Sequence, residues 1–93
     1  MRRLDLRGRF KADVLRKKRQ RVPIDWETLD YVFDEMISGR DVPEMLRPHP
    51  LHSEWAGYLD FHLEEDLLII YRLTTSWAEI HRLGTHRELF RSR

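Results

Sequence analysis

The sequence predicts an α+β domain in which an N-terminal strand and a two-helix hairpin precede a three-stranded antiparallel meander and a short C-terminal turn. Two observations carry this prediction. Apolar residues recur at helical spacing before residue 40, and they alternate at strand spacing after residue 55. With 93 residues, the chain is expected to form a single domain, residues 1–93, around one modest core.

The first half of the chain predicts one strand and two helices. Residues 2–7 alternate between apolar and charged side chains, and residues 9–20 place a thin apolar stripe opposite a basic face. Pro23 disfavours helix at the residue before it and so ends the first helix. Asp25 is a good N-cap for a second amphipathic helix that ends at Gly39. Two helices with so short a connection are expected to pack as an antiparallel hairpin.

The second half begins with a loop and a half-buried strand. Residues 40–54 contain three prolines and no periodicity, which predicts a loop. Residues 55–63 alternate, and this pattern places Tyr58, Asp60 and His62 on the face away from the core.

The remaining segments complete the meander. Residues 67–73 are almost entirely apolar, as expected of a central strand that is covered on both faces. Residues 77–83 predict the third strand, and Thr85 can cap a last short turn that runs to Phe90. We therefore expect one antiparallel sheet with the helices on one face.

Composition excludes several classes of protein. The chain has no cysteine, so a disulfide framework and a cysteine zinc site are excluded. No apolar run approaches the roughly 20 residues of a membrane span. The N-terminus is basic, with no apolar segment after it of the kind that a secretory signal requires. A cytoplasmic protein without a membrane partner is expected.

The net charge of +1 conceals a strong asymmetry along the chain. Residues 1–24 carry a net charge of +8, residues 25–66 carry −10, and residues 67–93 carry +3. The basic first helix is expected to meet phosphates, with Lys11 and Lys18 as its candidate RNA-binding residues. The alternative is that this helix simply presents a solvated face.

All five histidines lie between positions 49 and 86, near the ends of the predicted strands. Cleavage of RNA without a metal needs a base that takes the proton of the ribose 2′-OH and an acid that protonates the departing 5′-oxygen. Histidine suits both roles because its ordinary pKa of about 6.5 lies near neutral pH. The phosphate needs cations, and the fork of an arginine binds two of its oxygens. The histidine pattern is compatible with a metal-independent ribonuclease site, but composition and spacing alone indicate no more than a small α+β domain with RNA binding as a candidate function.

Several residues are candidates for that site. Asp66 follows His62 by four positions across a tight turn, so we expect its carboxylate to orient the imidazole. If the third strand pairs beside the second, His86 reaches the same edge of the sheet, and Arg82 is the candidate phosphate ligand there. Phe90 is a candidate for stacking on an RNA base, a contact worth about 1–3 kcal/mol.

Each candidate also has a structural interpretation. An isolated strand histidine is usually a surface or core residue, and Asp66 alone would be an ordinary turn residue. Phe90 alone would be core packing, and we interpret His52 and His81 as structural. Three histidines and an aspartate would also suit zinc, but their spacing matches no standard zinc motif. We therefore predict neither a metal ligand nor a cofactor.

Four short motifs in the second half resemble the YafQ-like toxins of the RelE/ParE superfamily, which are type II toxins. The likeness is most specific from His49 to Phe90. The motifs are His49-Pro50-Leu51, then Trp55-x-Gly57-Tyr58-x-Asp60-x-His62, then Asp66 before an apolar strand that ends in Ile70-Tyr71-Arg72, and then Arg82-x-Gly84-Thr85-His86-x-x-Leu89-Phe90.

The resemblance implies a RelE-like, microbial RNase-like fold and an mRNA interferase that cuts translated messages in the ribosomal A site. It also implies a cognate antitoxin that forms a hetero-oligomer with the toxin, and the ribosome and mRNA as further partners. Carried over position by position, the catalytic residues implied are His49, His62, Asp66, His86 and Phe90.

Within this set, His86 is the expected general acid, and Asp66 or His62 is the expected base. His49 is the expected phosphate ligand or a proton donor, and Arg72 is a further candidate for RNA binding. This chain has Leu59 where the family usually carries arginine, which is expected to change packing rather than catalysis.

Two other functions stay open. A ParE-like relative would be a non-enzymatic toxin or binding module that acts on DNA gyrase. A degenerate relative would keep only the ability to bind its antitoxin. A gyrase binder has no use for several titratable groups at one edge of a sheet, so the histidines discriminate between these functions.

Overall fold

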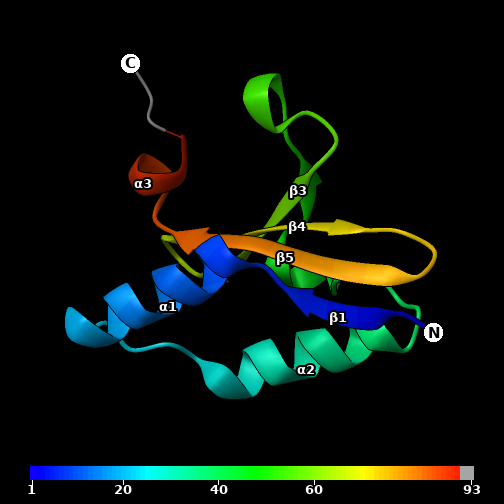
Figure 1. The fold of residues 1–93 in the computed structure, drawn as a ribbon, viewed down its shortest axis with the longest axis horizontal. Helices are drawn as coiled ribbons and strands as arrows, with labels where there is room; N and C mark the ends of the chain where they lie inside the picture. Colours follow the sequence, from blue (N-terminus) through cyan, green and yellow to red (C-terminus); the bar gives the residue numbers. More distant parts are fainter. Residues whose placement is uncertain (91–93) are drawn as a thin grey trace.

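A twisted five-stranded sheet organises the molecule (Figure 1). In this computed structural model, residues 1–90 are described. The strand order is β1-β5-β4-β3-β2; β1 pairs with β5 in parallel, and the other neighbours are antiparallel. The strands are β1 (Arg3–Leu6), β2 (His49–Pro50), β3 (Leu59–Glu64), β4 (Leu67–Leu73) and β5 (Trp77–Gly84).

Helices cover the two faces of the sheet unequally. The long helices α1 and α2 lie on one face, and the short helix α3 lies beyond the end of β5 on the other side (Figure 1). Two single turns of 3-10 helix, η1 and η2, interrupt the segment between α2 and β3. The helices are α1 (Gly8–Arg19), α2 (Trp26–Ile37), α3 (His86–Phe90), η1 (Glu44–Leu46) and η2 (Ser53–Trp55).

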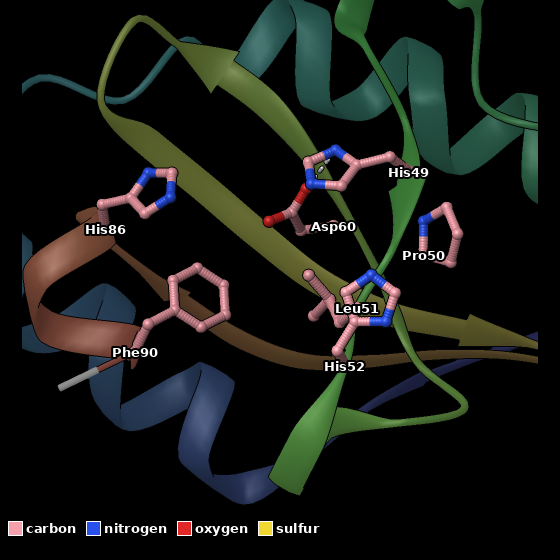
Figure 2. A pocket seen from close by; sticks show the side chains of 7 residues that line it. All are labelled: His49, Pro50, Leu51, His52, Asp60, His86 and Phe90. Atoms are coloured by element: carbon pink, nitrogen blue, oxygen red, sulfur yellow. Dashed lines mark ion pairs between the residues drawn. The ribbon is translucent and has the colours of Figure 1, made fainter. Parts of the chain in front are cut away.

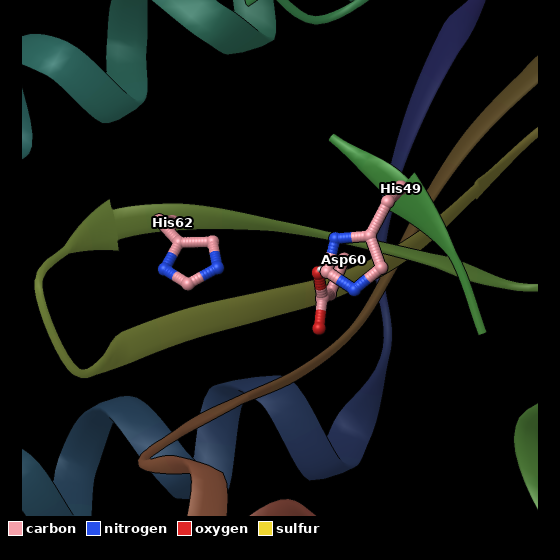
Figure 3. Close-up of side chains that lie close together, drawn as sticks. All are labelled: His49, Asp60 and His62. Atoms are coloured by element: carbon pink, nitrogen blue, oxygen red, sulfur yellow. Dashed lines mark ion pairs between the residues drawn. The ribbon is translucent and has the colours of Figure 1, made fainter. Parts of the chain in front are cut away.

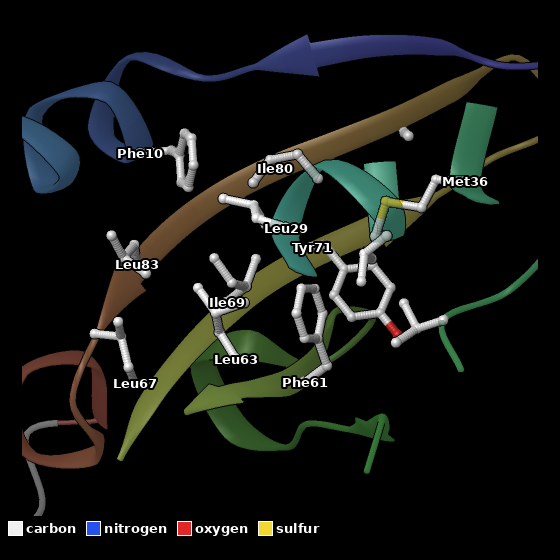
Figure 4. Close-up of a cluster of buried hydrophobic side chains, with 13 residues drawn as sticks. Phe10, Leu29, Met36, Phe61, Leu63, Leu67, Ile69, Tyr71, Ile80 and Leu83 are labelled. Atoms are coloured by element: carbon white, nitrogen blue, oxygen red, sulfur yellow. The ribbon is translucent and has the colours of Figure 1, made fainter. Parts of the chain in front are cut away.

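The alternation of β4 builds a core on each face. Odd-numbered residues of β4, such as Ile69, join the main cluster beneath α1 and α2 (Figure 4). Even-numbered residues Leu68 and Ile70 join Leu89 of α3 in a smaller cluster on the opposite face. The prediction that this strand is covered on both faces is confirmed, because residues 67–71 are all buried.

The α+β class and the principal elements are confirmed. Asp25 caps α2, as predicted, by accepting a hydrogen bond from the Thr28 backbone N–H at 3.1 Å. None of the helices in the described part of the chain is long and apolar enough to cross a membrane.

Four expectations about the arrangement were wrong. The sheet is not wholly antiparallel, because β1 runs parallel to β5. The two long helices each pack mainly on the sheet, α1 on β5 and α2 on β1, rather than against each other. Residues 40–54 are not all loop, since His49 and Pro50 form β2 and pair with β3. The strand expected at residues 55–63 begins only at Leu59, because η2 precedes it.

A buried carboxylate joins α1 to the end of β5. Asp13 is 2% exposed, and it accepts hydrogen bonds from Arg82 Nε at 2.7 Å and from the Leu83 backbone N–H at 2.9 Å. Arg16 on α1 also pairs with it. Burial by itself raises the pKa of Asp13, but these donors outweigh burial and hold the pKa below its ordinary value.

Replacing Asp13 with Asn should destabilise the protein by about 3 kcal/mol at neutral pH, because it leaves Arg82 without its anionic partner in a mostly buried position. Since the pKa of Asp13 is lower in the folded state, its contribution is present above the ordinary aspartate pKa and is lost as the pH falls through the folded value. Urea unfolding at pH 7 and at successively lower pH measures both effects.

The matched control is Asp30→Asn, on the exposed surface of α2. The gap in the free energy of unfolding between wild type and Asp13→Asn should narrow in acid, where Asp13 of the wild type is also neutral. A gap at pH 7 as small as that of the control would show that this ion pair does not hold the fold.

Candidate active site

The pairing of β2 with β3 places an exposed histidine against a buried carboxylate. His49 is the register partner of Asp60, and its Nδ1 atom lies 3.2 Å from Asp60 Oδ1. The His49 side chain is 53% exposed, whereas that of Asp60 is 1% exposed. Pro50 favours an extended backbone at His49, which is what a pairing of only two residues requires.

A second histidine and an arginine lie beside this pair. His62 stands two residues after Asp60 on the same face of β3, and its ring centroid is 6.4 Å from that of His49 (Figure 3). Arg47, immediately after η1, places Nη2 3.1 Å from His62 Nδ1. The loop before β2 therefore contacts His62 through Arg47 and leads directly into His49.

A shallow hollow lies between the β2–β3 pair and helix α3. Figure 2 shows His86 and Phe90 on one side, His49 on the other, and Asp60 between them. The rings of His86 and Phe90 are 5.2 Å apart between centroids. The hollow has a volume of about 220 Å³ and is lined by His49, Pro50, Leu51, His52, Asp60, His86 and Phe90.

Asp60 is the electrostatic centre of this hollow. Burial raises the pKa of its carboxyl group, and the nearby His49, His62 and His86 oppose that rise only in part. Among the described residues, Asp60 Oδ1 has no partner with hydrogen-bond geometry, although His49 Nδ1 lies close to it. A desolvated carboxyl group beside an imidazole suits the transfer of a proton.

Three contacts fix the start of α3 and therefore the position of His86. The His86 backbone N–H donates to Asp66 Oδ1 at 3.0 Å. Thr85 and Glu88 cap the helix reciprocally: Thr85 N–H donates to Glu88 Oε1 at 2.8 Å, and Glu88 N–H donates to Thr85 Oγ1 at 3.1 Å. Lys17 of α1, which is 3% exposed, donates to the same Glu88 carboxylate at 2.9 Å.

Comparison with known proteins identifies the family of the chain. A sequence model described as "Bacterial toxin of type II toxin-antitoxin system, YafQ" matches residues 2–91. The chain belongs to the YafQ family. The mRNA interferase toxin YafQ of Escherichia coli strain B / BL21-DE3 is 37% identical over 89 residues, which are 94% of each chain.

Solved structures of YafQ share the fold. The crystal structure of YafQ from E. coli strain BL21(DE3) has a TM-score of 0.82 at 33% identity, covering 97% of this chain and 99% of that one. YafQ in the crystal structure of the E. coli DinJ–YafQ complex has a TM-score of 0.80 at 34% identity, again covering 97% and 99%.

The structure of this YafQ-family chain brings together only part of the predicted site. His49, His86 and Phe90 line one hollow, and His62 lies beside it. The expectation that Asp66 orients the His62 ring was wrong, because Asp66 accepts the backbone N–H of His86 instead.

The predicted phosphate ligands lie elsewhere or are already paired. The guanidinium group of Arg82 is held by the buried Asp13 and is not aimed into the hollow. Arg72 pairs with Glu79 at 3.0 Å, and its guanidinium lies 5.1 Å from the centroid of the Tyr58 ring. The remaining two, Lys11 and Lys18, are exposed on α1 and do not line the hollow.

Sequence reasoning missed three residues of the site. The alternation predicts the correct face for Asp60 but does not mark it as a site residue, and His52, which the sequence interprets as structural, lines the hollow. Arg47 was not singled out. The sequence does contain a signal for Asp60: a carboxylate within a mostly apolar strand is rarely buried unless a partner or a function requires it.

A set of side chains that could bind a metal lies at the edge of the hollow. One donor atom from each of His49, Asp60 and His62 lies within 4.8 Å of the others, and imidazole and carboxylate are common ligands of transition metals. However, the guanidinium of Arg47 lies against His62, and a fixed cation favours an anion there over a metal ion. A metal-bound toxin from Helicobacter pylori shares the fold with a TM-score of 0.81 at 25% identity, covering 97% of this chain and 100% of that one.

Replacing Asp66 with Ala should speed hydrogen exchange of the His86 amide about fivefold, because the amide loses an acceptor worth about 1 kcal/mol at the start of α3. Asp66→Asn retains an acceptor oxygen and should leave the rate near that of the wild type. NMR-detected exchange at the amides of residues 86–88 measures both. Equal exchange in all three proteins would show that Asp66 does not hold α3.

Proposed function

We propose that this YafQ-family toxin is an endoribonuclease that cleaves mRNA by general acid–base catalysis without a metal. The observation that carries the proposal is the convergence of His49, His62 and His86 on the buried carboxyl group of Asp60. The E. coli relative named mRNA interferase toxin YafQ supports the same substrate.

The geometry suggests how the two protons move. His49, backed by Asp60, takes the proton of the ribose 2′-OH, and the 2′-oxygen forms a bond to the adjacent phosphorus. The bond from phosphorus to the 5′-oxygen breaks, and His86 on the opposite wall donates a proton to that oxygen. The products of this step are a 2′,3′-cyclic phosphate and a 5′-hydroxyl. Phe90, next to His86, offers a face on which a base can stack.

Roles for the remaining predicted residues follow from their contacts. Asp66 acts as a positioning residue, because its carboxylate holds the backbone from which His86 projects. Of the two candidate bases expected from the resemblance, Asp66 is therefore the less suitable, whereas His62 lies beside Asp60 within the proposed site.

We further propose that the ribosome presents the message. A hollow of about 220 Å³ is smaller than ordinary ligand pockets of roughly 300–1,000 Å³, so the protein alone encloses little of an RNA strand. The exposed basic surface of α1, which includes Lys11 and Lys18, suits contact with ribosomal RNA. A protein that acts on translating ribosomes works in the cytoplasm.

We also propose a cognate antitoxin as the partner of this chain, in a hetero-oligomer. Support comes from the relative YafQ, which is seen in complex with DinJ. The convergent histidines favour cleavage over the alternative in which a ParE-like toxin binds DNA gyrase.

His86→Gln and Asp60→Asn should each lower the rate of cleavage by roughly 10²–10⁴-fold, the range expected for loss of one acid or base. Primer extension on an mRNA under translation in a purified system measures the rate. His81→Gln is the matched control, because His81 pairs with Glu79 and does not line the hollow, and it should stay within about threefold of wild type. Intact mRNA together with inhibited supercoiling by gyrase would overturn the proposal.

Metal independence has a separate test. A chelator selective for transition metals, added while Mg²⁺ is kept at the level that ribosomes need, should leave the cleavage rate unchanged. Loss of cleavage on chelation, with recovery on adding Zn²⁺, would instead assign a catalytic metal to His49, Asp60 and His62.

A further inference from the structure

The proposed reaction needs a cation that the predicted arginines do not supply. Charge builds up on the phosphate oxygens in the transition state, and fixed donors must stabilise it. Arg82 is occupied by Asp13 and Arg72 by Glu79. Within residues 1–90, Arg47 makes no ion pair, and its guanidinium contacts His62.

The backbone of Arg47 is held in an uncommon conformation. Its φ of 56° and ψ of 55° lie in the left-handed region, at the end of η1 and directly before Pro48. Its N–H donates to the carbonyl of Glu44 at 2.9 Å, and its own carbonyl oxygen lies 3.4 Å from His49 Nδ1. Conformations of this kind are costly for a residue other than glycine and cluster at functional sites.

The guanidinium of Arg47 is partly unused. Its Nη2 atom lies 3.1 Å from His62 Nδ1. Because guanidinium only donates, His62 Nδ1 must be the acceptor, which leaves the ring proton on Nε2. In the described part of the chain, the Nε and Nη1 atoms of Arg47 have no hydrogen-bond partner, so one edge of its fork stays available to an anion.

We propose that Arg47 binds a phosphate of the RNA beside His49 and His62, donating to its non-bridging oxygens and stabilising their charge during cleavage. The inference rests on the proposed function and adds the ligand that neither Arg82 nor Arg72 provides. Arg47 then contacts two neighbouring histidines: its carbonyl oxygen lies against His49, and its side chain lies against His62.

Kinetics of cleavage give the first test. Arg47→Gln should lower kcat/KM about 10²-fold, as loss of one fixed donor to a developing oxyanion does. Arg47→Lys should recover part of this loss, because lysine restores the charge but not the fork. Arg40→Gln is the matched control, since it removes one exposed arginine that pairs with Glu35 outside the hollow. A loss for Arg47→Gln no larger than for the control would overturn the inference.

Binding of inorganic phosphate gives a second test that does not depend on cleavage. In the wild type, millimolar phosphate should shift the imidazole ¹⁵N signals of His62 and His49, and in Arg47→Gln these shifts should be at least fivefold smaller. Equal shifts in the two proteins would refute a phosphate site at Arg47. If the wild type bound phosphate through Arg47 but left mRNA intact, the proposed function would fail while the anion site stood.

Discussion

The site depends on one buried carboxyl group, Asp60, next to one exposed imidazole, His49. Burying a carboxylate is costly unless it is paired, so the buried Asp60 requires a nearby partner that can carry a positive charge. β2 provides that partner, His49, and its two residues form a strand only through their pairing with β3. The remaining parts of the site are arranged around this pair, with His62 along the same strand and His86 across the hollow.

The second wall of the hollow is anchored from the opposite face of the sheet. Helix α3 has only five residues, too few to be stable alone, and its start is capped by Thr85 and Glu88. Lys17 crosses from α1 to reach Glu88, and Asp13, one turn earlier, holds Arg82 and the end of β5. The ion pairs of α1 therefore act on the placement of His86, although α1 contributes no side chain to the hollow.

Periodicity predicted the elements well because it is local: the apolar alternation of β3 and the continuous apolar run of β4 can be recognised without knowing which strands pair with them. Contacts between distant residues could not be read in this way. Arg82 was assigned to phosphate because its partner, Asp13, lies 69 positions away and on another element. Arg47 could not be predicted from the sequence, because its proposed role depends on a left-handed backbone and on the register that brings His62 beside it.

The titration of the Asp60 carboxyl carbon, followed by ¹³C NMR, tests most directly whether this group is buried among imidazoles as described. The account predicts an apparent pKa above the ordinary aspartate value of about 3.9, because burial outweighs the opposing histidines. In His49→Ala the pKa should rise further, since the imidazolium that opposes the rise is gone. An apparent pKa at or below the ordinary value, unmoved by His49→Ala, would contradict the central role given to this pair.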